Sequence, residues 1–176
     1  YYHLTDQQLS KLERYYTLLK EWNEITNLTA ITDEQDVIDY HIDDSLRIST
    51  YIAMNSVQSF ADVGSGAGFP GLPLAIVYPD KKVTLIEVNT KKIQFLTLVI
   101  DTLGLHNVSI VEQDWRNFLR KTAMHIDLFC ARASLQPEEL VRLFQASSAN
   151  KNATLVYWAS QQFVPSAGVN TYIVVS

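Results

Sequence analysis

Short apolar runs and amphipathic stretches alternate along the chain from residue 57 onward. The apolar runs are rich in β-branched residues and have the length of strands, and they cover residues 58–63, 82–87, 107–111, 126–131 and 153–158. The stretches between them have the apolar period of helices, at residues 71–78, 90–103, 115–121 and 137–148. Such alternation predicts right-handed βαβ units, and therefore an α/β fold with a doubly wound, Rossmann-like parallel sheet covered on both faces. Residues 172–175 predict one further strand.

The first 56 residues have a different pattern, which predicts helices alone. Thr5 and Gln8 form a capping-box pair, and apolar residues then recur at helical spacing as far as Ile25. Two shorter helices are expected at residues 33–40 and 43–54. We therefore expect an N-terminal helical extension, residues 1–56, packed on a core of residues 57–176, with both parts in one globular domain.

Composition and charge restrict the class of protein. The chain has 176 residues, 47% of them hydrophobic, which suits one domain with a sizeable core. Its formal net charge of −5 argues against binding nucleic acid through bulk electrostatics, although a local basic patch is compatible with it. A single cysteine, Cys130, allows no internal disulfide and is expected to be buried and inert. The lack of a disulfide fits a reducing cytoplasm, and because no apolar run reaches about 18 residues we expect no membrane span.

The most specific motif is a glycine-rich turn within residues 60–71. Four of the six glycines fall there, directly after the first predicted strand, at Gly64, Gly66, Gly68 and Gly71. Glycines at the carboxyl end of a strand let a ligand approach the backbone closely. We expect the free N–H groups of this turn to point outward, toward a nucleotide-type cofactor.

Acidic and aromatic residues follow the next two predicted strands. Glu87 ends the second strand, about 20 residues beyond the glycines, where a carboxylate accepts hydrogen bonds from both ribose hydroxyls of a nucleotide. Asp114 and Trp115 follow the third strand, where they would form a wall against an adenine ring. Two plainer interpretations stay open: Glu87 as an ordinary strand-end carboxylate, and Trp115 as packing between a helix and the sheet.

The glycine spacing by itself fits two kinds of cofactor. Gly66-x-Gly68-x-x-Gly71 with Glu87 also satisfies the fingerprint of dinucleotide-binding proteins. Asp62, just before the turn, favours a cationic ligand such as S-adenosylmethionine over a pyrophosphate because of its charge. An NAD-dependent oxidoreductase should also carry a hydride-transfer acid, and we find no convincing one. His41 and Asp44, one helical turn apart, are too few ligands for a metal site.

The run Asp62-Val-Gly-Ser-Gly-Ala-Gly-Phe-Pro-Gly-Leu-Pro-Leu-Ala75 resembles the cofactor-binding motif of bacterial small-subunit rRNA guanine-N7 methyltransferases, the RsmG or GidB family. Further segments resemble the family in the same order, over roughly residues 15–160: Trp22-Asn23, Asn27-Leu28-Thr29, His41-x-x-Asp44-Ser45-Leu46, Leu85-Ile-Glu87, Lys91-Lys92, Phe95-Leu96 and Ala131-Arg132-Ala133. Two features depart from the family. Tyr157-Trp158-Ala159-Ser160 replaces its usual Lys-Gly, and the stretch from Gln161 to Tyr172 is shorter than its equivalent.

The resemblance implies methyl transfer from S-adenosylmethionine to N7 of a guanine in the 530 loop of 16S rRNA. No general base is expected, because N7 has a free lone pair and no proton to lose. The cofactor contacts implied are Asp62, Gly64, Ser65, Gly66, Gly68, Phe69, Glu87, Asp114, Trp115 and Arg132, with Arg132 also positioning the guanine. The acidic net charge favours rRNA within the 30S subunit or its precursor as the substrate of a monomeric protein. The alternatives are a methyltransferase with another substrate and a non-catalytic ribosome- or RNA-binding module.

Overall fold

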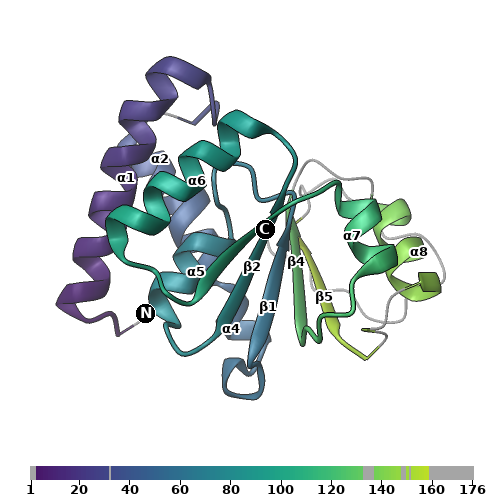
Figure 1. Ribbon diagram of the computed structural model, residues 1–176. Coiled ribbons are helices and arrows are strands. Elements are labelled where there is room, and N and C mark those ends of the chain that lie inside the picture. The colour runs from purple at the N-terminus through teal and green to yellow at the C-terminus, as the bar shows by residue number, and fades with distance from the viewer. Residues whose placement is uncertain (1–2, 32, 133–136, 148–149, 151, 159–176) are drawn as a thin grey trace.

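The central sheet is parallel throughout. The computed structural model describes residues 3–31, 33–132, 137–147, 150 and 152–158, in which five strands form one sheet in the order β3-β2-β1-β4-β5 (Figure 1). The strands are β1 (Ser59–Val63), β2 (Lys82–Glu87), β3 (Val108–Glu112), β4 (Leu128–Arg132) and β5 (Thr154–Trp158). β1 is central: Phe60 is paired with Val83 of β2 and with Leu128 of β4. The doubly wound α/β prediction is confirmed, with every strand within two residues of its expected bounds. The further strand predicted at residues 172–175 lies outside the described residues.

Helices cover both faces of this sheet (Figure 1). One face carries α1 (Asp6–Thr26), α5 (Gly71–Val77) and α6 (Thr90–Leu103), and the other carries α7 (Trp115–Lys121) and α8 (Pro137–Ser147). The predicted capping box of Thr5 and Gln8 begins α1. Asn89 and Asp114 cap α6 and α7 by accepting backbone N–H groups of the first turn. Each face has its own buried apolar cluster.

The second part of the N-terminal segment forms one helical run instead of the two helices predicted at residues 33–40 and 43–54. The run consists of α2 (Glu34–Val37), a π-helical turn (Ile38–Asp43), α3 (Asp44–Leu46) and α4 (Ile48–Tyr51), and a short 3-10 turn (Met54–Ser56) follows it. We call residues 34–51 the helical run. Its backbone keeps right-handed helical dihedral angles at Ile38, Asp44 and Arg47, and no glycine or proline interrupts it. Between α2 and α3 the helix widens into the π-helical turn, a distortion often found at functional sites.

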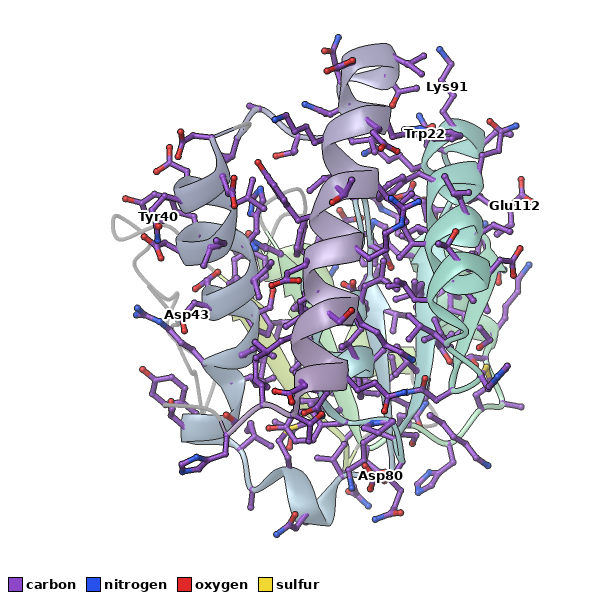
Figure 2. All side chains as sticks on the ribbon, turned by 90° about the vertical axis from the view of Figure 1, so that its left-hand side faces the viewer. Trp22, Tyr40, Asp43, Asp80, Lys91 and Glu112 are labelled. Carbon is purple, nitrogen blue, oxygen red and sulfur yellow. The ribbon has the colours of Figure 1, made fainter. Side chains whose placement is uncertain are left out.

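The N-terminal helices share the core of the sheet. Leu12, Tyr15, Leu18 and Leu19 of α1 are buried in the same apolar cluster as residues of β2, α5 and α6. α1 lies between the helical run and α6 (Figure 2). The middle of the stripe predicted for α1 is therefore core, whereas its two ends, Leu9 and Ile25, are 45% and 78% exposed. The buried part joins the N-terminal segment to the face of the sheet that carries α5 and α6.

Cys130 of β4 is fully buried. Its predicted burial is confirmed, and burial raises the pKa of the thiol well above the ordinary range, which favours the protonated form. Among the described residues, no helix is both long enough and apolar enough to cross a membrane.

Candidate functional site

A glycine-rich turn joins the central strand to α5. β1 ends at Val63, and α5 begins at Gly71, where the sequence predicts it. The φ angles of Gly64, Gly66 and Gly68 are 73°, 59° and 102°, which side chains other than glycine rarely adopt. The turn lies at the carboxyl edge of the parallel sheet, where open α/β folds bind their ligands.

Backbone N–H groups of the turn are engaged within the protein. Those of Gly64 and Ser65 both donate to the carbonyl oxygen of Ile86, at 2.9 and 3.1 Å. The N–H of Gly66 donates to Glu87 Oε2 at 2.8 Å. The prediction that the free N–H groups point outward is therefore wrong at these three positions. The reason is that β2, the neighbouring strand, ends beside the turn and supplies the acceptors.

The glycines of the turn have different surroundings. A Cβ atom at Gly68 would lie 2.4 Å from Leu72 Cδ1, and one at Gly71 would lie 2.4 Å from Leu85 Cδ2, so internal packing requires glycine at both. A Cβ atom at Gly66 would meet nothing closer than a carbonyl oxygen of the turn at 3.8 Å. The space beside the α-carbon of Gly66 is therefore open, and a ligand can reach the backbone there.

Asp62 is completely buried beneath the turn. Its Oδ2 accepts the N–H of Gly71 at 2.9 Å, which fixes the start of α5. Its Oδ1 is buried and has no hydrogen-bond partner among the described residues. Ser65 is also buried, and its hydroxyl donates to the Asp62 carbonyl at 2.9 Å. Burial raises the pKa of Asp62 to about 7, so the side chain is only partly charged near neutral pH.

Glu87 holds the turn to the end of β2. Its Oε2 accepts the Gly66 N–H, and its Oε1 accepts the N–H groups of Val88 and Asn89 at 2.8 and 2.9 Å. An ionised carboxylate has about four lone-pair sites, so three bonds leave room for one further donor. Glu87 at the end of β2 and Gly66 after β1 are thus in contact, as expected for residues that follow neighbouring strands.

Asp114 and Trp115 follow β3 at the same edge. Asp114 Oδ1 accepts the N–H groups of Arg116 and Asn117 at 3.0 and 3.3 Å and so caps α7. Trp115 is 7% exposed and belongs to the apolar cluster beneath α7 and α8. The guanidinium carbon of Arg116 lies 4.5 Å from the centroid of the Trp115 ring. Both residues therefore have structural contacts, in line with the plainer interpretation of Trp115.

Arg132 ends β4 and is held by the helical run. Its Nη2 donates to the carbonyl oxygen of Tyr40 and lies 3.5 Å from Asp44 Oδ2. Trp158 Nε1 donates to the carbonyl oxygen of Asp44 at 3.2 Å. The Arg132 side chain is largely buried, with 19% of its surface exposed. Arg132 and Asp44, which belong to separate motifs in the sequence, are thus neighbours in the structure.

Phe69 of the turn lies between two aromatic side chains of the N-terminal segment. Its ring centroid is 5.3 Å from that of Tyr15 and 4.5 Å from that of His41. The Tyr15 hydroxyl donates to the Ala67 carbonyl at 2.6 Å, and His41 Nε2 lies 2.9 Å from Thr29 Oγ1. Burial lowers the pKa of His41 to about 4, so the ring is neutral. No sequence pattern links Tyr15 to Ala67, because the two residues are 52 positions apart.

Within the part of the chain that the structure describes, no three histidine, cysteine, aspartate or glutamate side chains gather as metal ligands would. The residues that do converge are those of the turn, Glu87 and the buried carboxyl of Asp62. A parallel sheet with this turn after its central strand defines a Rossmann-like fold with a nucleotide-type site.

Several solved structures share this fold. A methyltransferase from Geobacter sulfurreducens has a TM-score of 0.61 and 14% identity, over 82% of this chain and 69% of its own. The putative methyltransferase yhhF from Escherichia coli has a TM-score of 0.56 and 19% identity, over 70% of this chain and 73% of its own. At such identities the similarity establishes the fold alone.

Sequence similarity establishes the family. The family model described as rRNA small subunit methyltransferase G (GidB) matches residues 8–165, so the chain belongs to this family, and the resemblance noted from its motifs is confirmed. The ribosomal RNA small subunit methyltransferase G of Staphylococcus carnosus is 49% identical over 115 residues, which are 65% of this chain and 48% of that protein. The one of Lactococcus lactis subsp. cremoris is 37% identical over 163 residues, 91% of this chain and 68% of that protein. The chain thus spans about half the length of the first of these relatives.

Proposed function

We propose that this protein transfers a methyl group from S-adenosylmethionine to N7 of a guanine in the 530 loop of 16S rRNA. The observation that carries the proposal is the arrangement at Gly66. Its N–H is bonded to Glu87, while the space beside its α-carbon is open. An accessible backbone and a carboxylate therefore lie together at the edge where a Rossmann-like fold binds a nucleoside. Membership of the family supports rRNA as the substrate.

The turn suits S-adenosylmethionine better than a dinucleotide. A pyrophosphate needs free N–H groups at the turn and at the start of the following helix. Here the N–H groups of Gly64, Ser65, Gly66 and Gly71 already donate to protein acceptors. Asp62 supplies a buried acceptor, Oδ1, which has no partner among the described residues. A cation bound near it would lower the pKa of this carboxyl and favour its charged form.

We assign the cofactor contacts as follows. The turn residues Gly64, Ser65, Gly66, Gly68 and Phe69 form the floor of the site, and Glu87 accepts a ribose hydroxyl. Asp62 lies beneath the turn, where a bound cation would favour its charged form, and Asp114 and Trp115 border the adenine. Bound S-adenosylmethionine supplies a methyl group on a positively charged sulfur atom. The task of the protein is then to exclude water and to hold the guanine in line, and orientation of this kind is worth about 7–11 kcal/mol of barrier.

Arg132 is the residue that we assign to the guanine. A guanidinium binds O6 of guanine or a phosphate through paired N–H groups. Its contacts with Tyr40 and Asp44 fix the side chain at the end of β4, next to β1. Because guanine N7 carries no proton, no general base is needed, and the neutral, buried His41 is not assigned that role.

The finer details of partners and location belong to the same proposal. A net charge of −5 disfavours tight binding to free RNA, so we infer that the substrate is the 30S subunit or its precursor. We further propose that the protein acts as a monomer in the cytoplasm. Equal methylation of naked 16S rRNA and of 30S particles would contradict the inference about the substrate.

Calorimetric titration with S-adenosylmethionine tests the cofactor site, with NAD as the competing ligand. Gly66→Asn fills the open space at the turn with a residue that tolerates left-handed backbone. Gly104→Asn is the matched control, because Gly104 has the same φ of 59° and an equally open surrounding at the end of α6. We expect micromolar binding of S-adenosylmethionine that Gly66→Asn weakens more than about tenfold, a loss of about 1.4 kcal/mol, while Gly104→Asn leaves it within about twofold.

Methylation of 30S subunits tests the reaction itself. Subunits isolated without the modification are incubated with radiolabelled S-adenosylmethionine, and the methylated guanine is located by chemical cleavage at 7-methylguanosine. Label confined to one guanine of the 530 loop supports the proposal. Binding of the cofactor without methylation of any rRNA would point to another substrate. Binding of NAD, or of neither ligand, would refute the assignment of the cofactor.

A further inference from the structure

We propose that Tyr15 of α1 is a positioning residue for the cofactor turn. Its hydroxyl fixes the backbone of the turn in the form that binds S-adenosylmethionine, although Tyr15 itself touches neither cofactor nor substrate. The inference rests on the proposed function, because it concerns the same site. It assigns part of the cofactor affinity to a helix that lies outside the βαβ unit of the turn.

The contacts of Tyr15 come directly from the structure. The side chain is completely buried, and its hydroxyl donates to the Ala67 carbonyl at 2.6 Å. Its ring lies 5.3 Å from the Phe69 ring, and 6.3 Å from that of Phe95 on α6. A Cβ atom at Gly68 would lie 2.9 Å from the hydroxyl oxygen. Tyr15 thus contacts three consecutive positions of the turn, from Ala67 to Phe69.

The backbone of this part of the turn has high intrinsic conformational freedom. Glycine loses more conformational freedom on folding than any other residue, and Gly66 and Gly68 flank Ala67 on both sides. On one side the Gly66 N–H is bonded to Glu87 of β2. On the other side the Ala67 carbonyl is bonded to Tyr15. The two bonds hold the peptide units on either side of the Gly66–Ala67 peptide, one to the sheet and one to α1. Together with the bond of 2.7 Å from the Gly68 N–H to the Ser65 carbonyl, they define one conformation of the turn.

The position of the Tyr15 hydroxyl is itself well determined. Tyr15 lies in the middle of a long helix, which packs between the helical run and α6 (Figure 2). Trp22, about two helical turns further along α1, contacts the same Phe95 ring at a centroid distance of 6.0 Å. Ring packing of this kind leaves the phenol one orientation, so the hydroxyl acts as a fixed donor.

Replacement of the hydroxyl alone tests the inference. Tyr15→Phe keeps the ring and its packing and leaves the Ala67 carbonyl without its donor. If the turn then spends most of its time in other conformations, the apparent dissociation constant rises as the binding-competent fraction falls. We expect a rise of about three- to tenfold for S-adenosylmethionine. Tyr16→Phe, on the neighbouring residue of α1, is the matched control and should change it less than about twofold. The kcat at saturating cofactor should stay close to that of the unchanged protein.

Hydrogen exchange of the Gly66 amide, followed by NMR, provides a second readout that does not depend on activity. Faster exchange and weaker cofactor binding in Tyr15→Phe, with neither in Tyr16→Phe, support the inference. Faster exchange with unchanged affinity would overturn it, since Tyr15 would then serve stability alone. Equal effects of both variants would also overturn it, because the cause would be α1 as a whole. If the unchanged protein fails to bind S-adenosylmethionine, the proposed function fails first, and this outcome is visible before any variant is compared.

Discussion

Replacing Asp62 by asparagine isolates the effect of one buried carboxyl on stability. The amide side chain of the Asp62→Asn variant would still offer an oxygen to the N–H of Gly71, so the start of α5 keeps its acceptor. The variant lacks the ionisable carboxyl group, so position 62 no longer titrates. Burial raises the pKa of Asp62 from 3.8 to about 7 in the folded protein, whereas in the unfolded chain the carboxyl titrates near its ordinary value.

The sign of the effect follows from proton binding. Between about pH 4 and pH 7 the folded protein holds a proton on Asp62 that the unfolded chain has lost, so the stability due to this group falls as pH rises. A shift of about three pKa units at about 1.4 kcal/mol each gives a total of about 4 kcal/mol. His41 acts in the opposite direction. Its pKa is lowered from 6.5 to about 4, so the stability due to it rises over nearly the same range and masks Asp62 in the unchanged protein.

Urea unfolding at about pH 4.5, 5.5, 6.5 and 7.5, without cofactor, measures the difference between Asp62→Asn and the unchanged protein. Groups that both proteins share cancel in this difference, including His41. We expect the variant to gain about 3–4 kcal/mol relative to the unchanged protein between the lowest and the highest pH, and its own stability to rise with pH because of His41. A difference that does not vary with pH would refute the raised pKa of Asp62.

Three further changes follow from contacts described above. Gly68→Ala places a Cβ atom 2.4 Å from Leu72 Cδ1 at a φ of 102°, so we expect a loss of about 2–4 kcal/mol in urea unfolding; a loss below about 1 kcal/mol would contradict the tight packing. Glu87→Gln removes the charge that accepts the Gly66 N–H, and calorimetry should show cofactor binding weakened about tenfold or more, with unchanged affinity as the contrary result. Arg116→Met breaks the bond to Glu139 at 2.7 Å, but because solvent screens this surface pair the change in Tm should be small and should shrink further in high salt. A large, salt-independent loss would show that this ion pair is stronger than its exposure implies.

Much of the fold is readable from the sequence because it depends on local pattern. Buried parallel strands are short, continuous apolar runs, and the helices between them begin at recognisable caps such as Asn89 and Asp114. The sequence predicts two helices, at residues 33–40 and 43–54, because a local pattern does not show whether the backbone continues from one to the next. The π-helical turn at Ile38–Asp43 spans the predicted gap without a break.

The sequence predicts which residues lie at the site, but it does not predict which acceptors the N–H groups of the turn bind. The glycine pattern locates the turn and Glu87 correctly, because both follow from strand ends. Whether the N–H groups of the turn point outward depends on how far β2 extends beside the turn. The register between β1 and β2 sets this extent. Ile86 and Glu87 lie close enough to accept them. The bond from the Tyr15 hydroxyl to the Ala67 carbonyl could not be predicted either, since it depends on the tertiary position of α1.

The central position of β1 also bears on how the protein folds as it is made. β1 pairs with β4 as well as with β2, and the Ser59 N–H at its beginning is bonded to Asp127, 68 residues further along. At about 5–20 residues per second, several seconds separate the synthesis of these two segments. During this interval the nascent chain presents the open edge of an apolar strand, which is prone to pair with other chains. Chains that end before residue 128 would keep this edge permanently exposed, so premature termination should yield aggregates and not shorter folded proteins.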